Sequence, residues 1–552
     1  MRSEAAAVKG RAVSARAGPR FALLAGFAAV AAASASLALR QLGDPGIYYD
    51  EVIQAVPAAD FLADRAPAPI PGRTQTRLWG RWFPVMTQPY MGALKSQLLI
   101  PSFAAFGATP AALRVTTWLW TLAGVGFAML LARELWGTPA AILAGALLAL
   151  DPSVLFVGRH DWGSFALAFL LRSAGLWLAV SGWRRGSSAR LALAGLAFGL
   201  GLYNKVDFGV FLAGAAVAWA LAAPRTLWAA VRAPRRLGAG LAGFALGAAP
   251  MLAALPGALA AGQAFAGHEG AAPDWGEKWA ALFATLDGSY FQRLILAGGR
   301  FDALASVQGS ARSPFPLLLA ASWLFLCGRL ARAPGRPERS LVVGLVALGL
   351  AGYALTPHAE RVHHALALAP FAQFAVAAAL ADVWRLGGGR LASRAAAAGL
   401  AALALAGSAR VDLHTLATLE ETGGRGRWSD ALGRFAAGLD PGTAVVALDW
   451  GFAEPLRFLA PEVPVLEPIW ELRRRPSLAL EGDGSSLYLV QSPEWAVFDH
   501  GGRFLEALAA LPPEALEIRA LPDRAGRTAF LAVRIARPHR LDYRGSFVVR
   551  LR

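Results

Sequence analysis

The sequence contains a single cysteine, Cys327, among its 552 residues. One cysteine excludes an intramolecular disulfide scaffold and a metal site built from cysteines. Charged residues are also scarce, at 16% of the chain, where a soluble domain carries about 25%. Hydrophobic residues make up 56% instead, which excludes a disordered chain. The composition therefore favours an integral membrane protein.

The sequence instead contains long runs of apolar residues. A helix needs about 20 apolar residues to cross a bilayer, and eleven runs approach that length. The first run is longer than the apolar part of a signal peptide, so we interpret it as a retained anchor. The sequence predicts a polytopic α-helical membrane protein with about eleven transmembrane helices, at residues 21–39, 115–132, 138–157, 163–183, 191–203, 208–224, 237–262, 313–328, 341–357, 365–384 and 391–409.

Acidic residues are fewer than basic ones, 37 against 53, which gives a net charge of +16. Most of the excess arginine lies in short loops that alternate spans place on one side, and the positive-inside rule makes that side cytoplasmic. This explains the charge without nucleic acid, which would need a basic soluble face. The N-terminus is then cytoplasmic. The loop arginines are Arg184, Arg185, Arg190, Arg225, Arg232, Arg235, Arg236, Arg329, Arg332, Arg336, Arg339, Arg385, Arg390 and Arg394.

The same topology divides the chain into two parts. Residues 1–412 form the membrane domain, with outer loops at 41–114 and 257–312, and residues 413–552 form an extracytoplasmic domain. In this tail, short apolar strands alternate with short helices, which is typical of a small α/β domain with a partly parallel sheet. No glycine-rich phosphate loop follows its first strand, so nucleotide binding is not supported.

Carboxylates gather at the outer ends of the predicted spans. Asp50 and Glu51 lie in the first outer loop, where the apolar spacing that follows predicts an amphipathic helix on the membrane face. Asp161 ends the sequence Arg159-His160-Asp161 directly before another span. Both acidic positions also suit the N-terminal capping of a helix, because acidic groups favour helix N-termini.

Cations lie at the same outer level. Lys205 and Asp207 lie between two spans, and either an ordinary ion pair or snorkelling explains the lysine. Another short loop carries His358, Arg361, His363 and His364, which together suggest an anion-binding surface. Histidines beside a carboxylate could also hold a metal, although this spacing matches no strong zinc signature. Arg172, in the middle of a span, either meets a carboxylate or points into a cavity.

Carboxylates, lysine, arginine and histidine on one membrane face suit sugar transfer from a lipid-linked phosphosugar. A carboxylate can accept the proton of the acceptor hydroxyl as general base. Cations stabilise the charge that develops on the leaving phosphate. Because a lipid donor enters from the bilayer, such a site must lie at the interface.

In this order along the chain, several motifs resemble those of the GT-C membrane glycosyltransferases. The similarity is greatest to family 39, which includes the protein O-mannosyltransferases, and to the aminoarabinose transferases. It covers about residues 20–410. The motifs are Asp50-Glu51, residues 88–95 with Gln88 and Lys95, Phe106-Gly107, Ala112-Leu113-Arg114, Arg133 with Trp136-Gly137, Leu150-Asp151-Pro152, Arg159-His160-Asp161, Lys205, and His363-His364 before Pro370.

The resemblance implies an inverting transferase that uses a polyprenyl- or dolichyl-phosphate sugar. Asp50 is then the general base, Glu51 supports it, and Asp161 is the second acidic site. The predicted substrate-binding residues are Lys95, Arg159, His160, Lys205, His358, Arg361, His363 and His364.

The chain departs from the family at two motifs. Gln88 stands where aminoarabinose-transferase-like members have a lysine, and His363-His364 replaces an Arg-Tyr-type motif. The donor sugar is therefore undefined. The resemblance implies no certain cofactor and leaves a divalent metal possible.

Two alternatives belong to other classes. A transporter or flippase of a lipid or polar solute predicts charges at the membrane midplane and broken helices, whereas only Arg172 is deep. A non-catalytic scaffold predicts that Asp50 and Asp161 are dispensable. The acceptor could be a lipid, a glycan or a protein. The abundance of Ala, Arg and Gly suggests a GC-rich bacterial genome, and hence an inner membrane with the tail in the periplasm.

Overall fold

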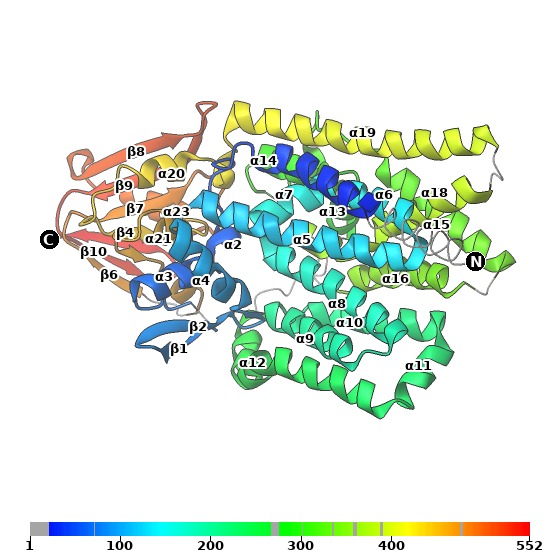
Figure 1. The fold of residues 1–552 in the computed structure, drawn as a ribbon. Helices are drawn as coiled ribbons and strands as arrows, with labels where there is room; N and C mark the ends of the chain where they lie inside the picture. Colours follow the sequence, from blue (N-terminus) through cyan, green and yellow to red (C-terminus); the bar gives the residue numbers. More distant parts are fainter. Residues whose placement is uncertain are drawn as a thin grey trace, which may run out of the picture.

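A helical bundle and a C-terminal β-rich domain lie end to end in the computed structural model (Figure 1). The structure describes residues 21–70, 72–266, 275–300, 302–333, 336–356, 361–386, 390–474 and 478–552. Eight helices in these ranges are long and apolar enough to cross a membrane, or nine if one bent pair counts as a span. The eight segments are Phe21–Ala38, Pro110–Trp136 (α5), Trp162–Arg185, which contains α8 (Phe165–Arg185), Pro234–Gly257, which lies within α12 (Pro234–Ala266), Phe315–Arg332 (α15), Pro337–Leu355 (α16), Val362–Leu386, which ends in α18 (Phe371–Leu386), and Leu391–Thr422 (α19).

The predicted count of eleven therefore exceeds the eight or nine long apolar helices, although each predicted run is mainly helical over its described residues. Two of the runs form shorter helices, α9 (Ser188–Asn204, 17 residues) and α10 (Phe208–Ala222, 15 residues). The helix α11 (Pro224–Val231) joins α10 to α12. The polytopic helical fold itself is confirmed.

The run at 138–157 is a pair of helices, α6 (Thr138–Ala149) and α7 (Pro152–His160), bent by 60°. Asp151 caps α7 by accepting hydrogen bonds from the backbone N–H groups of Ser153 and Val154 at 2.9 and 3.2 Å. Pro152 at the first helical position has no N–H to continue α6. An aspartate–proline pair therefore breaks the span and turns α7 toward the loop that follows it.

A second break precedes α18, where α17 (Val362–Ala365) and η3 (Leu366–Leu368) lead to Pro370. Arg172 of α8 donates hydrogen bonds to the exposed carbonyls of this break, at 3.3 Å to Leu366 and 2.8 Å to Ala367, and also bonds Ala369. Among the described residues, no carboxylate pairs with this arginine. The guanidinium of Arg172 therefore supplies hydrogen bonds to carbonyls of the unwound backbone. The Arg172 side chain also lines a cavity described below.

Close glycine contacts join α9 to α12. A Cβ added at Gly195 would lie 1.9 Å from the carbonyl oxygen of Gly240, and one at Gly243 would lie 2.0 Å from that of Ala192. Small residues allow membrane helices to approach at backbone distance, where dispersion contacts are most numerous. The spacing of these glycines thus fixes one helix pair of the bundle.

The first outer segment is compact rather than spread on a membrane surface. It contains α2 (Tyr49–Val52), α3 (Val56–Ala63), β1 (Thr74–Leu78), β2 (Arg81–Gln88), β3 (Met91–Gly92) and α4 (Leu94–Phe106). The amphipathic helix expected after Asp50 is wrong in both extent and setting. It is interrupted at residues 53–55. Residues 56–61 are buried, and Val56, Ala58 and Ala59 pack against Leu99 and Phe103 of α4 and Phe458 of the C-terminal domain, while the buried Asp60 pairs with Arg65.

The second outer segment contributes α13 (Trp275–Leu286), α14 (Tyr290–Leu296) and η2 (Leu304–Ser306). Phe291 of α14 stacks on Phe156 and on Trp162, with ring centroids 4.9 Å apart in both pairs. The segment therefore packs on the loop that carries Asp161.

Basic helix ends meet at the opposite end of the bundle from the C-terminal domain (Figure 1). The guanidinium of Arg184 lies 3.7 Å from Glu134 and 3.2 Å from Glu338, so the ends of α5 and α8 meet the start of α16. Arg339 pairs with Asp382 of α18 at 2.6 Å. The loops that the positive-inside rule assigned to one side thus share one end of the molecule.

The C-terminal domain has the predicted α/β character. Its five-stranded sheet has the order β5-β4-β7-β9-β8, in which β5, β4 and β7 are parallel and β9 and β8 are antiparallel. The last membrane helix, α19, continues to Thr422, ten residues beyond the expected domain boundary. The elements are η4 (Gly426–Trp428), α20 (Ala431–Ala436), β4 (Val445–Ala447), α21 (Ala453–Leu459), β5 (Val465–Leu466), α22 (Ile469–Arg474), β6 (Leu478–Gly482), β7 (Leu487–Gln491), α23 (His500–Leu508), η5 (Pro513–Ala515), β8 (Leu516–Pro522), β9 (Thr528–Ile535), β10 (His539–Tyr543) and β11 (Phe547–Leu551).

Candidate active site

Asp50 is an acidic residue of the first outer loop whose side chain has no hydrogen-bond or ion-pair partner among the described residues. It lies in the first turn of α2 and is partly buried. Burial raises the pKa of Asp50 to about 6, against the opposing positive charges of Arg361, Lys205, Arg427 and Lys95. An unpaired carboxyl group with a raised pKa can accept a proton near neutral pH.

Glu51, the next residue, is held tightly. Its two carboxylate oxygens accept hydrogen bonds from the Nε and Nη2 atoms of Arg114 at 2.6 and 2.9 Å, and both side chains are fully buried. Arg114 also donates to the carbonyls of Leu42 and Pro45 at 2.8 and 2.9 Å. Glu51 therefore anchors the loop that carries Asp50, and its supporting role in catalysis stays a prediction.

Asp161 is paired as well. The Lys95 ammonium lies 3.0 Å from its Oδ2 atom, with both side chains fully buried, and it also donates to the Glu51 carbonyl at 3.0 Å. Lys95 was expected to bind substrate and Asp161 to be the second acidic group. The structure joins the two residues in one ion pair, which links α4, α2 and the loop after α7.

Arg159 and His160 also have protein partners. Arg159 donates to the carbonyls of Ala38, Arg40 and Asp44 at 3.2, 2.8 and 3.0 Å. His160 is buried, and its Nδ1 atom lies 2.8 Å from the Phe156 carbonyl oxygen. Arg159 therefore holds the chain that leads to Asp50. The substrate binding that the sequence analysis expected of both residues stays a prediction.

Two of the remaining predicted cations, Lys205 and Arg361, act on Asp50 through their charge. Lys205, at the C-terminal end of α9, pairs with Asp207 at 2.9 Å and is nearly buried. Arg361 begins α17, and its charge and that of Lys205 both reach Asp50. His358 lies outside the described residues.

The two histidines of α17 lie against the loop that follows Asp161. Their rings are 4.1 Å apart, and a Cβ added at Gly163 would lie 2.5 Å from the His363 ring. Only a glycine leaves room for this contact. The structure therefore brings together residues from four separate segments that the sequence placed at the same membrane level.

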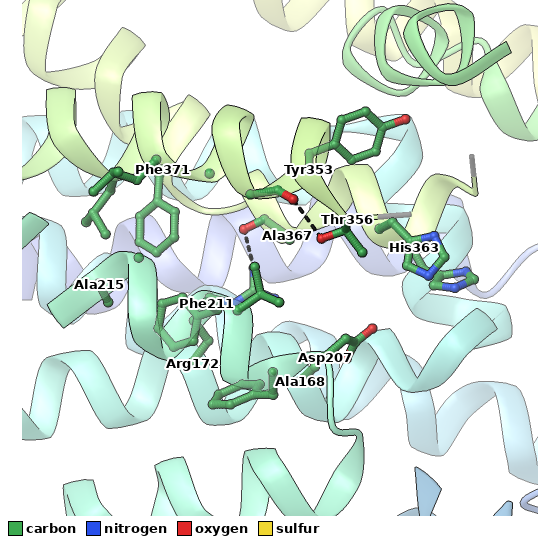
Figure 2. A pocket seen from close by; sticks show the side chains of 18 of the residues that line it. Ala168, Arg172, Asp207, Phe211, Ala215, Tyr353, Thr356, His363, Ala367 and Phe371 are labelled. Atoms are coloured by element: carbon green, nitrogen blue, oxygen red, sulfur yellow. Dashed lines mark hydrogen bonds between the residues drawn. The ribbon is translucent and has the colours of Figure 1, made fainter. Parts of the chain in front are cut away.

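An apolar cavity leads away from these histidines (Figure 2). It has a volume of about 90 Å³ and lies between α8, α10, α16 and the break before α18. Figure 2 shows Phe371 and Ala215 toward one end, and His363 and Asp207 toward the other. One end is thus lined mainly by apolar residues, with Arg172 beside Phe211, and the other end reaches His363 and Asp207, the partner of Lys205.

Sequence reasoning missed Arg427, whose charge also reaches Asp50. It lies in η4, where its backbone N–H donates to the Gly298 carbonyl at 3.2 Å and its guanidinium donates to the Gly299 carbonyl. Arg427 is more than 370 residues from Asp50 in the sequence, in a domain that the motifs do not cover. No local pattern could have indicated it.

The acidic residues do not form a ligand set for a metal. Glu51 and Asp161 are already neutralised by buried cations. In the described part of the chain, no group of three or more His, Cys, Asp or Glu side chains could hold an ion. The described residues therefore do not fit the divalent metal that the resemblance left possible, and no step of the reaction proposed below involves one.

Comparison with known proteins agrees with this fold. A family model described as dolichyl-phosphate-mannose-protein mannosyltransferase matches residues 94–252. Among curated proteins, no match reaches significance.

Solved structures match over most of the chain. ArnT from Cupriavidus metallidurans bound to undecaprenyl phosphate has a TM-score of 0.54 at 16% identity, covering 92% of this chain and 97% of ArnT. The Archaeoglobus fulgidus oligosaccharyltransferase in complex with Zn and sulfate has a TM-score of 0.50 at 16% identity, covering 80% of this chain and 62% of that protein. The family match and the fold confirm the resemblance to GT-C superfamily membrane glycosyltransferases that the sequence motifs indicated.

Proposed function

We propose that this chain is an inverting glycosyltransferase that moves a sugar from a polyprenyl-phosphate donor to an acceptor on the extracytoplasmic membrane face. The observation that carries the proposal is Asp50. Of the three predicted catalytic carboxylates, it is the one that has no hydrogen-bond or ion-pair partner among the described residues, and the positive charges of Arg361 and Lys205 reach it. The likeness to ArnT, solved with undecaprenyl phosphate, supports the class of donor.

The reaction is a single displacement. Asp50 accepts the proton of an acceptor hydroxyl, and the hydroxyl oxygen forms a bond to the anomeric carbon of the sugar. The bond between that carbon and the phosphate oxygen breaks, and the polyprenyl phosphate leaves with the electron pair. Lys205 and Arg361 stabilise the second negative charge on this phosphate. One displacement without a covalent intermediate inverts the anomeric centre.

The cavity would hold the first isoprene units of the carrier. Its walls are apolar from Phe371 to Phe211, and its other end reaches His363 and His364. The acceptor, whether lipid, glycan or protein, would approach Asp50 from the side of the C-terminal domain. We propose a bacterial inner membrane with this domain in the periplasm, because the basic loops share the opposite end of the molecule.

The alternative of a transporter predicts broken helices and deep charges. The structure has two broken spans, but the deep Arg172 is bound to backbone carbonyls at the break before α18. Such a contact explains an intramembrane arginine without a substrate pathway.

The test uses purified protein, a panel of polyprenyl-phosphate sugars and candidate acceptors. Asp50→Asn keeps the shape of the side chain and removes its basicity, and we expect a fall in kcat of about 100- to 10,000-fold. Asp64→Asn is the matched control, because Asp64 is an exposed carboxylate of the same outer loop, at the C-terminal end of α3. An Asp50→Asn variant as active as Asp64→Asn would exclude Asp50 as the base.

A further inference from the structure

Tyr48 and Tyr49, the two residues before Asp50, pack against side chains of the C-terminal domain. The ring of Tyr48 stacks on Trp428, with centroids 3.7 Å apart and planes inclined by 19°. Trp450 meets Tyr48 edge-on at 5.3 Å and also packs on Tyr49 at 4.7 Å. Both tyrosines are almost completely buried, at 2% and 1% exposure. Trp428 and Trp450 thus hold the backbone that leads directly into Asp50.

A polar contact supplements the aromatic ones. The Tyr49 hydroxyl donates to the Oε2 atom of Glu467 at 3.4 Å, and the indole N–H of Trp470 donates to the same oxygen at 3.1 Å. Glu467 precedes α22 in the C-terminal domain. We call Trp428, Trp450 and Glu467 the tyrosine clamp.

The chain before Tyr48 is attached to the same domain. Arg524, in the turn between β8 and β9, pairs with Asp44 at 2.7 Å, and the Gly46 N–H donates to the Trp428 carbonyl at 2.9 Å. A Cβ added at Gly46 would lie 2.1 Å from the carbonyl oxygen of Ser429, so the two backbones touch there. The C-terminal domain therefore contacts this segment from residue 44 to residue 49.

The membrane domain holds the other side of the same segment. Arg159 and Arg114 bind its backbone carbonyls up to Pro45, and Arg114 binds Glu51 directly after Asp50. Asp50 itself has no such contact within the described residues. Its position therefore depends on its neighbours, and two of those neighbours are held by the C-terminal domain.

We propose that the C-terminal domain completes the active site, and that Trp428 and Trp450 are positioning residues that fix Asp50 through Tyr48 and Tyr49. This inference rests on the proposed function, in which Asp50 is the base. A displacement of about 1 Å at a reacting group can cost about 100-fold in rate. Through these two tryptophans, the C-terminal domain affects catalysis without contacting the substrate.

The first experiment needs no transferase activity. A diazo reagent esterifies protonated carboxyl groups, so mass spectrometry of the Asp50 peptide against pH gives the midpoint of its protonation. In the wild-type protein the pKa raised by burial predicts a midpoint near pH 6. Release of α2 in Trp428→Leu or Trp450→Leu exposes Asp50, and the midpoint falls by one unit or more toward the ordinary value of about 4.

Two further variants separate positioning from general damage. Trp450→Phe retains an aromatic ring and keeps the midpoint near that of the wild type. Phe504→Leu shortens a fully buried side chain in the same domain, away from the clamp, and leaves the midpoint unchanged. An unchanged midpoint in both tryptophan-to-leucine variants overturns the proposal, and so does an equal shift in Phe504→Leu.

Kinetics provide the second measurement. We expect kcat to fall by about 100-fold in Trp450→Leu, with the KM for the donor within about threefold, since Lys205 and Arg361 are untouched. A raised KM at unchanged kcat would overturn the positioning role. If Asp50→Asn retains full activity, the proposed function fails, whereas the esterification midpoints still show whether the clamp places Asp50.

Discussion

The ion pair between Lys95 and Asp161 provides the sharpest test of which charged residues hold the site together. The Lys95 ammonium lies 3.0 Å from Asp161 and 3.0 Å from the Glu51 carbonyl, with no exposure of either charged side chain. Lys95→Met leaves a buried carboxylate without its cation, and loss of one partner of a buried pair costs about 3–5 kcal/mol. We expect a similar loss of unfolding free energy for Asp161→Asn.

The double variant distinguishes a structural pair from two independent residues. Lys95→Met with Asp161→Asn removes both charges, so no unpaired ion remains. The side-chain oxygen of the introduced asparagine can still accept the hydrogen bond that Asp161 accepts from the backbone N–H of Ala166 at 2.6 Å. The loss of stability in the double variant should therefore be smaller than the sum of the two single losses by about 2 kcal/mol, within the range usual for contacting residues.

The assay is unfolding of the purified protein by titration with SDS in mixed micelles, for the wild type, both single variants and the double variant. The KM for the polyprenyl-phosphate donor is measured in parallel. If Lys95→Met is as stable as the wild type and its donor KM is strongly raised, our reasoning is refuted. Lys95 would then bind the substrate, as the sequence analysis expected.

Two further predictions concern the pH dependence of the reaction and the packing of the site. Because a general base acts as the carboxylate and burial raises the pKa of Asp50 to about 6, kcat/KM should fall tenfold per unit below about pH 6. Arg427→Gln removes a charge that lowers this pKa, so the acidic limb of the pH–rate profile should move to higher pH; an unmoved limb would contradict the assignment. Gly163→Ala places a methyl group 2.5 Å from the His363 ring and should reduce both activity and thermal stability. Gly80→Ala is the control for this variant, because Gly80 also has a positive φ but has open space around it. Equal losses of activity and thermal stability in the two variants would show that backbone strain alone causes them.

The membrane fold was predictable because its cause is local. Each span needs only a run of apolar residues, and each of the eleven predicted runs is mainly helical over its described residues. The break within 138–157 was missed, although Asp151-Pro152 is a recognisable helix start. Mean hydropathy is averaged over a window of residues, so the Asp151-Pro152 dipeptide does not show in it. From the sequence, the two bent helices were therefore interpreted as one span.

The chemistry of the site was predictable only in part. The sequence predicted that Asp50, Lys205 and Arg361 lie on one face of the membrane, because the topology of the spans fixes the side on which each loop lies. It could not show that Lys95 and Asp161 neutralise each other, or that Arg159 binds backbone carbonyls. An ion pair depends on distances between loops, and no pattern along the chain contains them.

The sequence by itself thus determined the class of the protein, its helices and the level at which its charges lie, since these follow from composition and local order. Only the tertiary structure decided which carboxylate is left unpaired, and that Trp428 and Trp450 of the C-terminal region contact the tyrosines before Asp50. The reason is physical: the ionisation and position of a side chain depend on the groups packed within a few ångströms of it, and here those groups come from opposite ends of the chain.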